Sequence, residues 1–233
     1  MALSRVVEAD QITIQVETTL RQIIAGEIEA IAIQLQQFLV RQNLTVARLQ
    51  LQIGRVTVSP RDARRGKILL LQPATGVLII AIAAQALSQA LFEEVHSQFS
   101  LRDQSPHNSI QSPHNSIIDQ VSIVAIECSF TEVNSILIQV QWLPSLGGMR
   151  QAMVTLIPDL CPGSARVELI TQNFEFDPLP DQVLAAIQTS LVNILNLRDF
   201  TNRGTEFEVQ SIAIANQQLV LHANAEIFEF PSQ

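Results

Sequence analysis

The stretch PDQVLAAIQTSLVNILNLRDF, residues 180–200, decides how the C-terminal part of the chain folds. It predicts a helix over residues 182–197, with Asp181 as the N-cap because its carboxylate can accept from the free N–H groups of the first turn. Apolar side chains recur along one face of this helix, at Leu184, Ile187, Leu191 and Ile194. A single apolar stripe of this kind requires a sheet or another helix to cover it.

Strands surround this helix in the sequence. Residues 207–211 and 219–227 alternate between apolar and polar side chains on either side of the turn-like Asn216-Gln217-Gln218, which predicts a hairpin. Similar alternation predicts strands at 12–16, 28–35, 44–58, 121–130, 136–142, 153–157 and 167–171. A phase slip at Gly54-Arg55 predicts a β-bulge that bends the strand over 44–58.

A second helix is predicted over residues 84–98, and no helical pattern separates most successive strands. Parallel strands would need such crossovers, so the sheet should be mainly antiparallel. The sequence therefore predicts an α+β fold in which a long, curved, mainly antiparallel sheet packs around two main helices.

Composition excludes some classes of function. The 233 residues are 47% hydrophobic and only 15% charged, yet no apolar run reaches the roughly 18 residues that a membrane span needs. The net charge of −8 argues against nucleic acid as a partner. The N-terminal residues lack the apolar core of a secretory signal, so we expect a location in the cytoplasm or at the periphery of a membrane.

Motifs for catalysis, metal or cofactor binding are missing from the sequence. It holds no GxSxG nucleophile motif and no glycine-rich phosphate loop, and its four histidines lack acidic or cysteine neighbours at ligand spacing. Cys128 and Cys161 are far apart, which favours two free thiols, although one disulfide between them is possible. We therefore expect a protein without enzymatic activity, metal or cofactor.

Residues 104–117 contain the heptapeptide QSPHNSI twice in tandem. Ser-Pro and His-Asn favour loops, so the repeat is interpreted as a duplication tolerated in an exposed inserted loop. The alternative is a metal site, because the repeat contains two histidines seven residues apart. No cysteine or acidic cluster accompanies them as further ligands. No linker divides the chain, and residues 1–233 are predicted to form a single domain.

Several segments resemble one known family in order and spacing. They are ILNLRDF (194–200), LVLHANAEIFEFPS (219–232), LRQIIAGEIEAIAIQL (20–35), LTVARLQLQIGRVTVSP (44–60) and GKILLLQPATGVLIIAIAAQALSQAL (66–91). Together they resemble the LmeA family of phospholipid-binding proteins from cyanobacteria and actinobacteria, and the resemblance covers most of the chain. It implies a fold like the tubular lipid-binding folds, and binding of a phospholipid or another acyl-chain ligand, with lipid transfer or envelope and membrane maintenance as the wider role.

The stripe on the C-terminal helix is our candidate for one wall of an apolar groove that faces the curved sheet. Such a groove would hold lipid chains, because each buried CH₂ contributes about 0.8 kcal/mol. A filled core would have the same composition. The alternative is therefore a structural or adaptor domain that binds a protein partner through a sheet edge.

Basic residues are concentrated in one short segment. Arg55, Arg61, Arg64, Arg65 and Lys67 lie within thirteen residues that contain one acidic residue, Asp62. The segment is either a solubilising loop or a docking point for phosphate headgroups, where each basic residue near an anionic surface is worth about 1 kcal/mol.

Replacing Arg61, Arg64, Arg65 and Lys67 with Gln tests this choice. If the loop docks on headgroups, the variant should sediment less with anionic liposomes at low salt, and the difference should vanish near 1 M salt, where the Debye length is about 3 Å. Folding should be unchanged, because exposed charges contribute little to stability. If variant and parent sediment equally at low salt, the segment is a solubilising loop and not a docking point.

Overall fold

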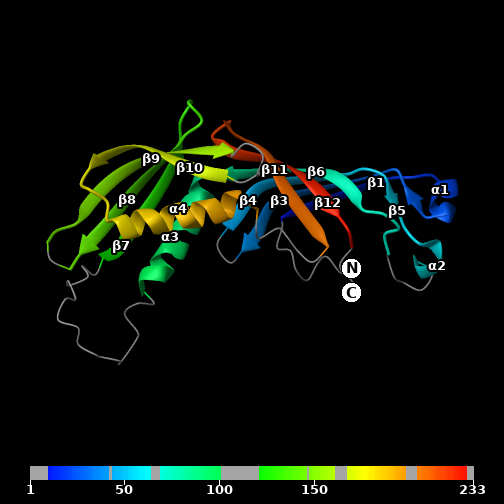
Figure 1. Ribbon diagram of the computed structural model, residues 1–233, viewed down its shortest axis with the longest axis horizontal. Helices are drawn as coiled ribbons and strands as arrows, with labels where there is room; N and C mark the ends of the chain where they lie inside the picture. Colours follow the sequence, from blue (N-terminus) through cyan, green and yellow to red (C-terminus); the bar gives the residue numbers. More distant parts are fainter. Residues whose placement is uncertain are drawn as a thin grey trace, which may run out of the picture.

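The computed structural model describes residues 10–41, 44–63, 69–100, 121–145, 147–160, 167–197 and 204–229. The molecule is elongated, with two helices beneath a sheet at one end and a second sheet that extends away from them (Figure 1). Every strand pairing within these residues is antiparallel. The predicted α+β class, with a long antiparallel sheet and two main helices, is confirmed, and over the described residues the sheet is not closed.

The larger sheet has six strands and forms the middle of the molecule. Their order across the sheet is β1 (Gln11–Glu17), β3 (Ala30–Arg41), β4 (Leu44–Ile53), β6 (Ala74–Ala83), β12 (Gln218–Ile227) and β11 (Thr205–Ala215). The C-terminal hairpin thus completes a sheet that the N-terminal strands begin. Asn216 and Gln217 connect its two strands with φ of 51° and 58°, the backbone of a tight turn that matches strand twist.

The smaller sheet has four strands, in the order β10 (Val167–Phe176), β9 (Arg150–Leu160), β8 (Ile136–Pro144) and β7 (Val121–Phe130). One face of β8 and β9 is buried at every second residue, as expected for strands covered on one side. Asn134, in the turn before β8, accepts a 2.7 Å hydrogen bond through its side chain from the backbone N–H of Ile214 in β11. This bond ties the two sheets together.

The two main helices are α3 (Ala84–Ser100) and α4 (Asp181–Leu195), close to the predicted ranges. They lie under the smaller sheet (Figure 1), where α3 packs on β7 and α4. Their apolar faces join those of both sheets in one continuous core. The fold therefore has a single main hydrophobic cluster, shared by the helices and both sheets.

Two local predictions are corrected by the structure. Residues 44–58 are not one bent strand: β4 ends at Ile53, and β5 (Val56–Thr57) pairs instead with β2 (Glu27–Ile28). Asp181 is the first helical residue and not the N-cap, a position that Pro180 occupies without any side-chain hydrogen bond. The carboxylate of Asp181 still lies in the first turn, where the helix dipole favours negative charge.

The far end of the molecule carries two short helices, α1 (Leu20–Ala25) and α2 (Pro60–Ala63) (Figure 1). The side chains of Thr19 and Gln22 form a capping box at the start of α1, and Gly26 ends the helix with φ of 79°. A Cβ at Gly26 would lie 2.4 Å from the carbonyl oxygen of Val58. Gly26 is therefore required for the close contact between the end of α1 and the segment before α2.

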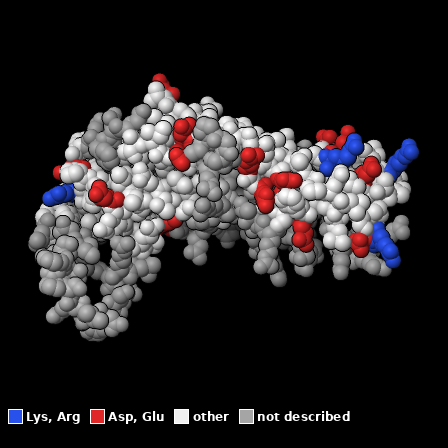
Figure 2. Space-filling view, in the orientation of Figure 1, with Lys and Arg blue, Asp and Glu red and all other residues white. Residues whose placement is uncertain are grey.

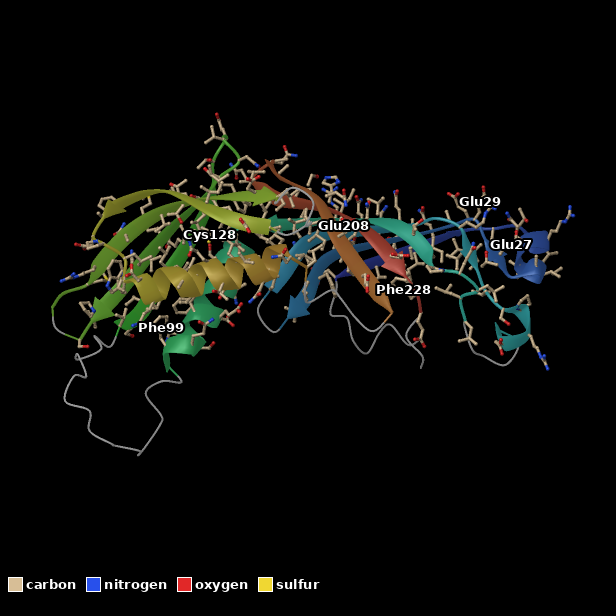
Figure 3. The ribbon with its side chains drawn as sticks, in the orientation of Figure 1. Glu27, Glu29, Phe99, Cys128, Glu208 and Phe228 are labelled. Atoms are coloured by element: carbon tan, nitrogen blue, oxygen red, sulfur yellow. The ribbon has the colours of Figure 1, made fainter. Side chains whose placement is uncertain are left out.

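Cys128 is a free thiol buried between β7 and α3 (Figure 3). The hydroxyl of Ser88 in α3 accepts a 2.8 Å hydrogen bond from the backbone N–H of Cys128 and donates to the carbonyl of Ala84. Burial raises the pKa of Cys128 to about 12, and a separate hydrogen bond between the thiol and the side chain of Ser88 lowers the pKa only in part. Cys161 and the tandem repeat at 104–117 lie outside the described residues.

This raised pKa predicts a loss of stability in alkaline solution. The unfolded thiol ionises near its ordinary value of 9.0 and the folded thiol near about 12. The thiol's contribution is therefore complete below pH 9 and falls as the pH rises toward 12. Relative to Cys128→Ala, the free energy of unfolding of the parent should fall by about 1 kcal/mol between about pH 8 and pH 10 in urea titrations. A difference that does not change with pH would contradict the burial of this thiol.

Candidate functional site

The stripe predicted on the C-terminal helix lies in the main core. Ile187, Leu191 and Ile194 are buried, while Leu184 is half-buried and packs against the same cluster. Val183, which was not assigned to the stripe, is fully buried beside them. The structure thus brings the four predicted residues together on one face of α4, in contact with protein side chains. Their role in lipid binding remains a prediction.

A buried hydroxyl in this helix lacks a partner among the described residues. Ser190 is fully buried, and no described group lies within hydrogen-bond distance of its hydroxyl. A buried hydroxyl without a partner costs about 1 to 3 kcal/mol relative to a paired one. The packing of α4 on the core is therefore not optimised for stability at this point.

The six-stranded sheet has one apolar face, and its strand register aligns the apolar side chains in rows across it. The first row is Ile12, Leu35, Leu49, Ile80, Leu221 and Ile212. The second row is Ile14, Ile33, Leu51, Leu78, Ala223 and Val209. Aligned rows of this kind form a continuous apolar surface, because side chains directly opposite each other on paired strands are in contact.

Exposure changes along these rows. Leu78 and Ile80 in the middle of the sheet are fully buried. At the β1 edge, Ile12, Ile14 and Val16 are 44%, 47% and 51% exposed. The apolar surface therefore runs from the core beside the helices to an edge strand that is open to solvent. Sequence alternation identified β1, but the register that aligns it with the core is not visible in the sequence.

The opposite face of the same sheet is polar and acidic. It contains an open hollow of about 1230 Å³ whose lining includes four carboxylates, those of Glu17, Glu206, Glu208 and Glu226. Glu206 and Glu226 are direct cross-strand partners, an arrangement of like charges that weakens the sheet. Glu208 lies on β11, the edge strand of this sheet opposite β1 (Figure 3). The hollow would repel a phosphate group.

No group of three or more acidic, histidine or cysteine side chains in the described ranges is arranged to hold a metal ion. Among the four carboxylates of the hollow, only Glu206 and Glu226 are direct cross-strand partners. Within the described part of the chain, no helix combines the length and the apolar character that crossing a bilayer requires.

Of the predicted headgroup contacts, only Arg61 lies within the described residues; Arg64, Arg65 and Lys67 lie outside them. Arg61 is exposed in α2, at the far end of the molecule. Arg21 in α1 and Arg55 before β5 are also exposed there. Figure 2 shows most of the visible basic side chains at this end, where acidic side chains lie among them, and further acidic side chains along the rest of the visible face.

Comparisons with known proteins agree with this apolar surface. The family model described as LmeA-like phospholipid-binding matches residues 2–224, nearly the whole chain. No curated protein and no solved structure matches the chain. A match of this extent assigns the family: the chain belongs to the LmeA-like phospholipid-binding family.

Proposed function

We propose that this protein binds a phospholipid, or another ligand with acyl chains, against the apolar face of the six-stranded sheet and the α4 stripe, without catalysing a reaction. The observation that carries the proposal is the continuity of the apolar rows from the core to the open β1 edge. Membership of a phospholipid-binding family supplies the class of ligand.

The physical basis is burial of apolar surface. Each CH₂ of an acyl chain that leaves water contributes about 0.8 kcal/mol. The half-exposed side chains of Ile12, Ile14 and Val16 would also lose water contact when a chain covers them. Binding along these rows would therefore remove apolar surface from water on both the acyl chain and the protein.

The chemistry of the two sheet faces indicates how the ligand would be oriented. Carboxylates line the hollow on the polar face, so an anionic headgroup is disfavoured there. Exposed Arg21 and Arg61 lie at the α1 and α2 end, where β1 also finishes. The acyl chains would lie on the apolar face, with the headgroup directed toward these arginines.

The α4 stripe would participate only if the helix shifts. Its side chains are in contact with the core, so a chain that enters there must replace protein contacts. Two features favour such a shift: Pro180 at the N-cap of α4 makes no side-chain hydrogen bond, and the buried hydroxyl of Ser190 has no partner within the described part of the chain. We propose that α4 is the movable wall of the site, and that loading and release suit a carrier in lipid transfer or in maintenance of an envelope or membrane.

One observation favours the second candidate function, an adaptor that binds a protein through a sheet edge. β1 is an edge strand, and all seven of its residues are exposed. An open edge presents unpaired backbone groups to which another strand can add. Native mass spectrometry of gently purified protein separates the candidates, because co-purified phospholipid supports the carrier and a bare mass supports the adaptor.

Ile14→Gln tests the open part of the apolar face. Ile14 is half-exposed, so the variant should lose little stability, while phospholipid per folded molecule should fall several-fold. Thr13→Gln is the matched control, because Thr13 precedes Ile14 on the same strand and its side chain points to the opposite face. Equal occupancy in both variants, measured by native mass spectrometry, would exclude this face as the site.

Leu191→Gln tests the α4 wall. A buried polar substitution should cost a few kcal/mol of stability whether or not lipid binds. The proposal requires an additional loss of lipid per folded molecule, measured beside the melting temperature. Ala185→Gln is the control, because Ala185 is an exposed residue of the same helix. Unchanged occupancy in folded Leu191→Gln would make the α4 stripe part of a filled core only.

A further inference from the structure

The short helix α1 exposes its apolar side chains. Leu20, Ile23 and Ile24 are 76%, 57% and 68% exposed, and no residue of the helix is buried. Their spacing is that of one helical face, which in most helices packs against the rest of the protein. Here that face is open to solvent.

Hydrogen bonds nevertheless stabilise both ends of α1. A helix of six residues is not stable by itself in water, and this one gains nothing from burial. The capping box of Thr19 and Gln22 holds its start. At its end, the carbonyl of Gly26 accepts a 2.8 Å hydrogen bond from the backbone N–H of Val58. The structure thus fixes three aliphatic side chains in place at the tip of the molecule.

More apolar side chains lie at the same end. The backbone of residues 57–59 bonds on one side to Gly26 and on the other to Leu69 and Leu71. Leu69 and Leu71 are both exposed. The open side chains of β1 lead toward α1, since Val16 is separated from Leu20 by only three residues. The exposed apolar surface therefore continues from the tip along β1 to the core.

Basic residues accompany this surface. Arg21 lies within α1, which contains no acidic residue, and Arg61 is exposed in the neighbouring α2. Glu27 and Glu29 follow α1 in the chain, on the segment that leads back to β3 (Figure 3). Glu17 and Asp62 are acidic and lie at this end as well. The arginines therefore provide local contacts for phosphate headgroups, not an overall positive charge.

We propose that α1 is a membrane wedge: Leu20, Ile23 and Ile24 insert between the lipids of an anionic phospholipid bilayer, while Arg21 and Arg61 contact the headgroups. Aliphatic side chains beside basic ones are typical of segments that lie at a membrane interface. A stable protein interface needs roughly 800 Å² from each partner, more than a helix of six residues provides. The inference rests on the proposed function in that the bilayer is the source or destination of the bound lipid.

The wedge differs from attraction by charge alone, because insertion of aliphatic side chains is not screened by salt. The test variant carries Leu20→Ser, Ile23→Ser and Ile24→Ser. These side chains are exposed, so the variant should melt at the parent's temperature. The matched control carries Val133→Ser, Met149→Ser and Val124→Ser, which are comparably exposed and lie on or beside the smaller sheet, away from α1.

Flotation with vesicles of phosphatidylglycerol and phosphatidylcholine in equal parts, at low salt and near 1 M salt, measures the effect. The α1 variant should bind about tenfold less than parent and control at both salt concentrations, since apolar insertion is lost. Equal binding of the α1 variant and the parent, or a parent that does not bind vesicles, would overturn the wedge. A parent that dimerises in solution while the α1 variant is monomeric would assign the surface to a second copy instead.

A second measurement separates this proposal from the proposed function. Short-chain phosphatidylglycerol added as monomers should load the α1 variant as well as the parent, because the apolar face is unchanged. Loss of vesicle binding with normal loading supports the wedge. Loss of loading in the α1 variant would show that α1 belongs to the ligand site and would overturn its assignment as a separate docking element. Failure of the parent to load would count against lipid binding itself.

Discussion

The pairing register of the six-stranded sheet is the constraint on which the rest of the structure depends. Side chains alternate between the two faces of a strand, so a slip of one residue would exchange them. Ile14, Ile33 and Leu51 share one face because β1, β3 and β4 pair in a fixed register. The same register places Gln52 and Val77 on the other face. Both the apolar rows and the acidic hollow follow from it.

The two faces have opposite chemistry, and this difference gives the molecule a direction. The apolar face is covered by the helices near the centre and open at β1, whereas the polar face carries the carboxylates of Glu206, Glu208 and Glu226. At the α1 end of the molecule, exposed arginines (Figure 2) lie near the exposed apolar side chains of α1. The proposed lipid site depends on this difference between the two faces.

Much of the fold could be predicted from the sequence because alternation and helical spacing are local patterns. They identified both main helices to within two residues of their ends and most of the strands. They did not show where the strand over 44–58 stops, because the break at Gly54-Arg55 is decided by the pairing of β5 with β2. Nor could they exclude a proline as the N-cap of α4, since Asp181 has the right chemistry one position later.

The candidate site was predictable only in part. The α4 stripe was visible as a periodic pattern, but its contacts with the core depend on tertiary packing. The apolar edge at β1 was hidden because it arises from register between distant strands. In α1, the spacing of Leu20, Ile23 and Ile24 is the pattern of a buried face, and the structure shows the reverse. Local periodicity cannot report whether another element covers a face.

The position of β12 in the sheet has a consequence for folding. This strand, which ends at Ile227, lies between β6 and β11, and it pairs with a strand that ends at Ala83. When β6 leaves the ribosome, more than half of the chain's length must still be made before its partner arrives. Its edge, with the apolar run Leu78–Ile82, stays unpaired for that time, and unpaired apolar edges promote aggregation. Folding should therefore be slow, limited by long-range pairing, and cells that produce this protein would benefit from a chaperone that covers β6 until synthesis ends.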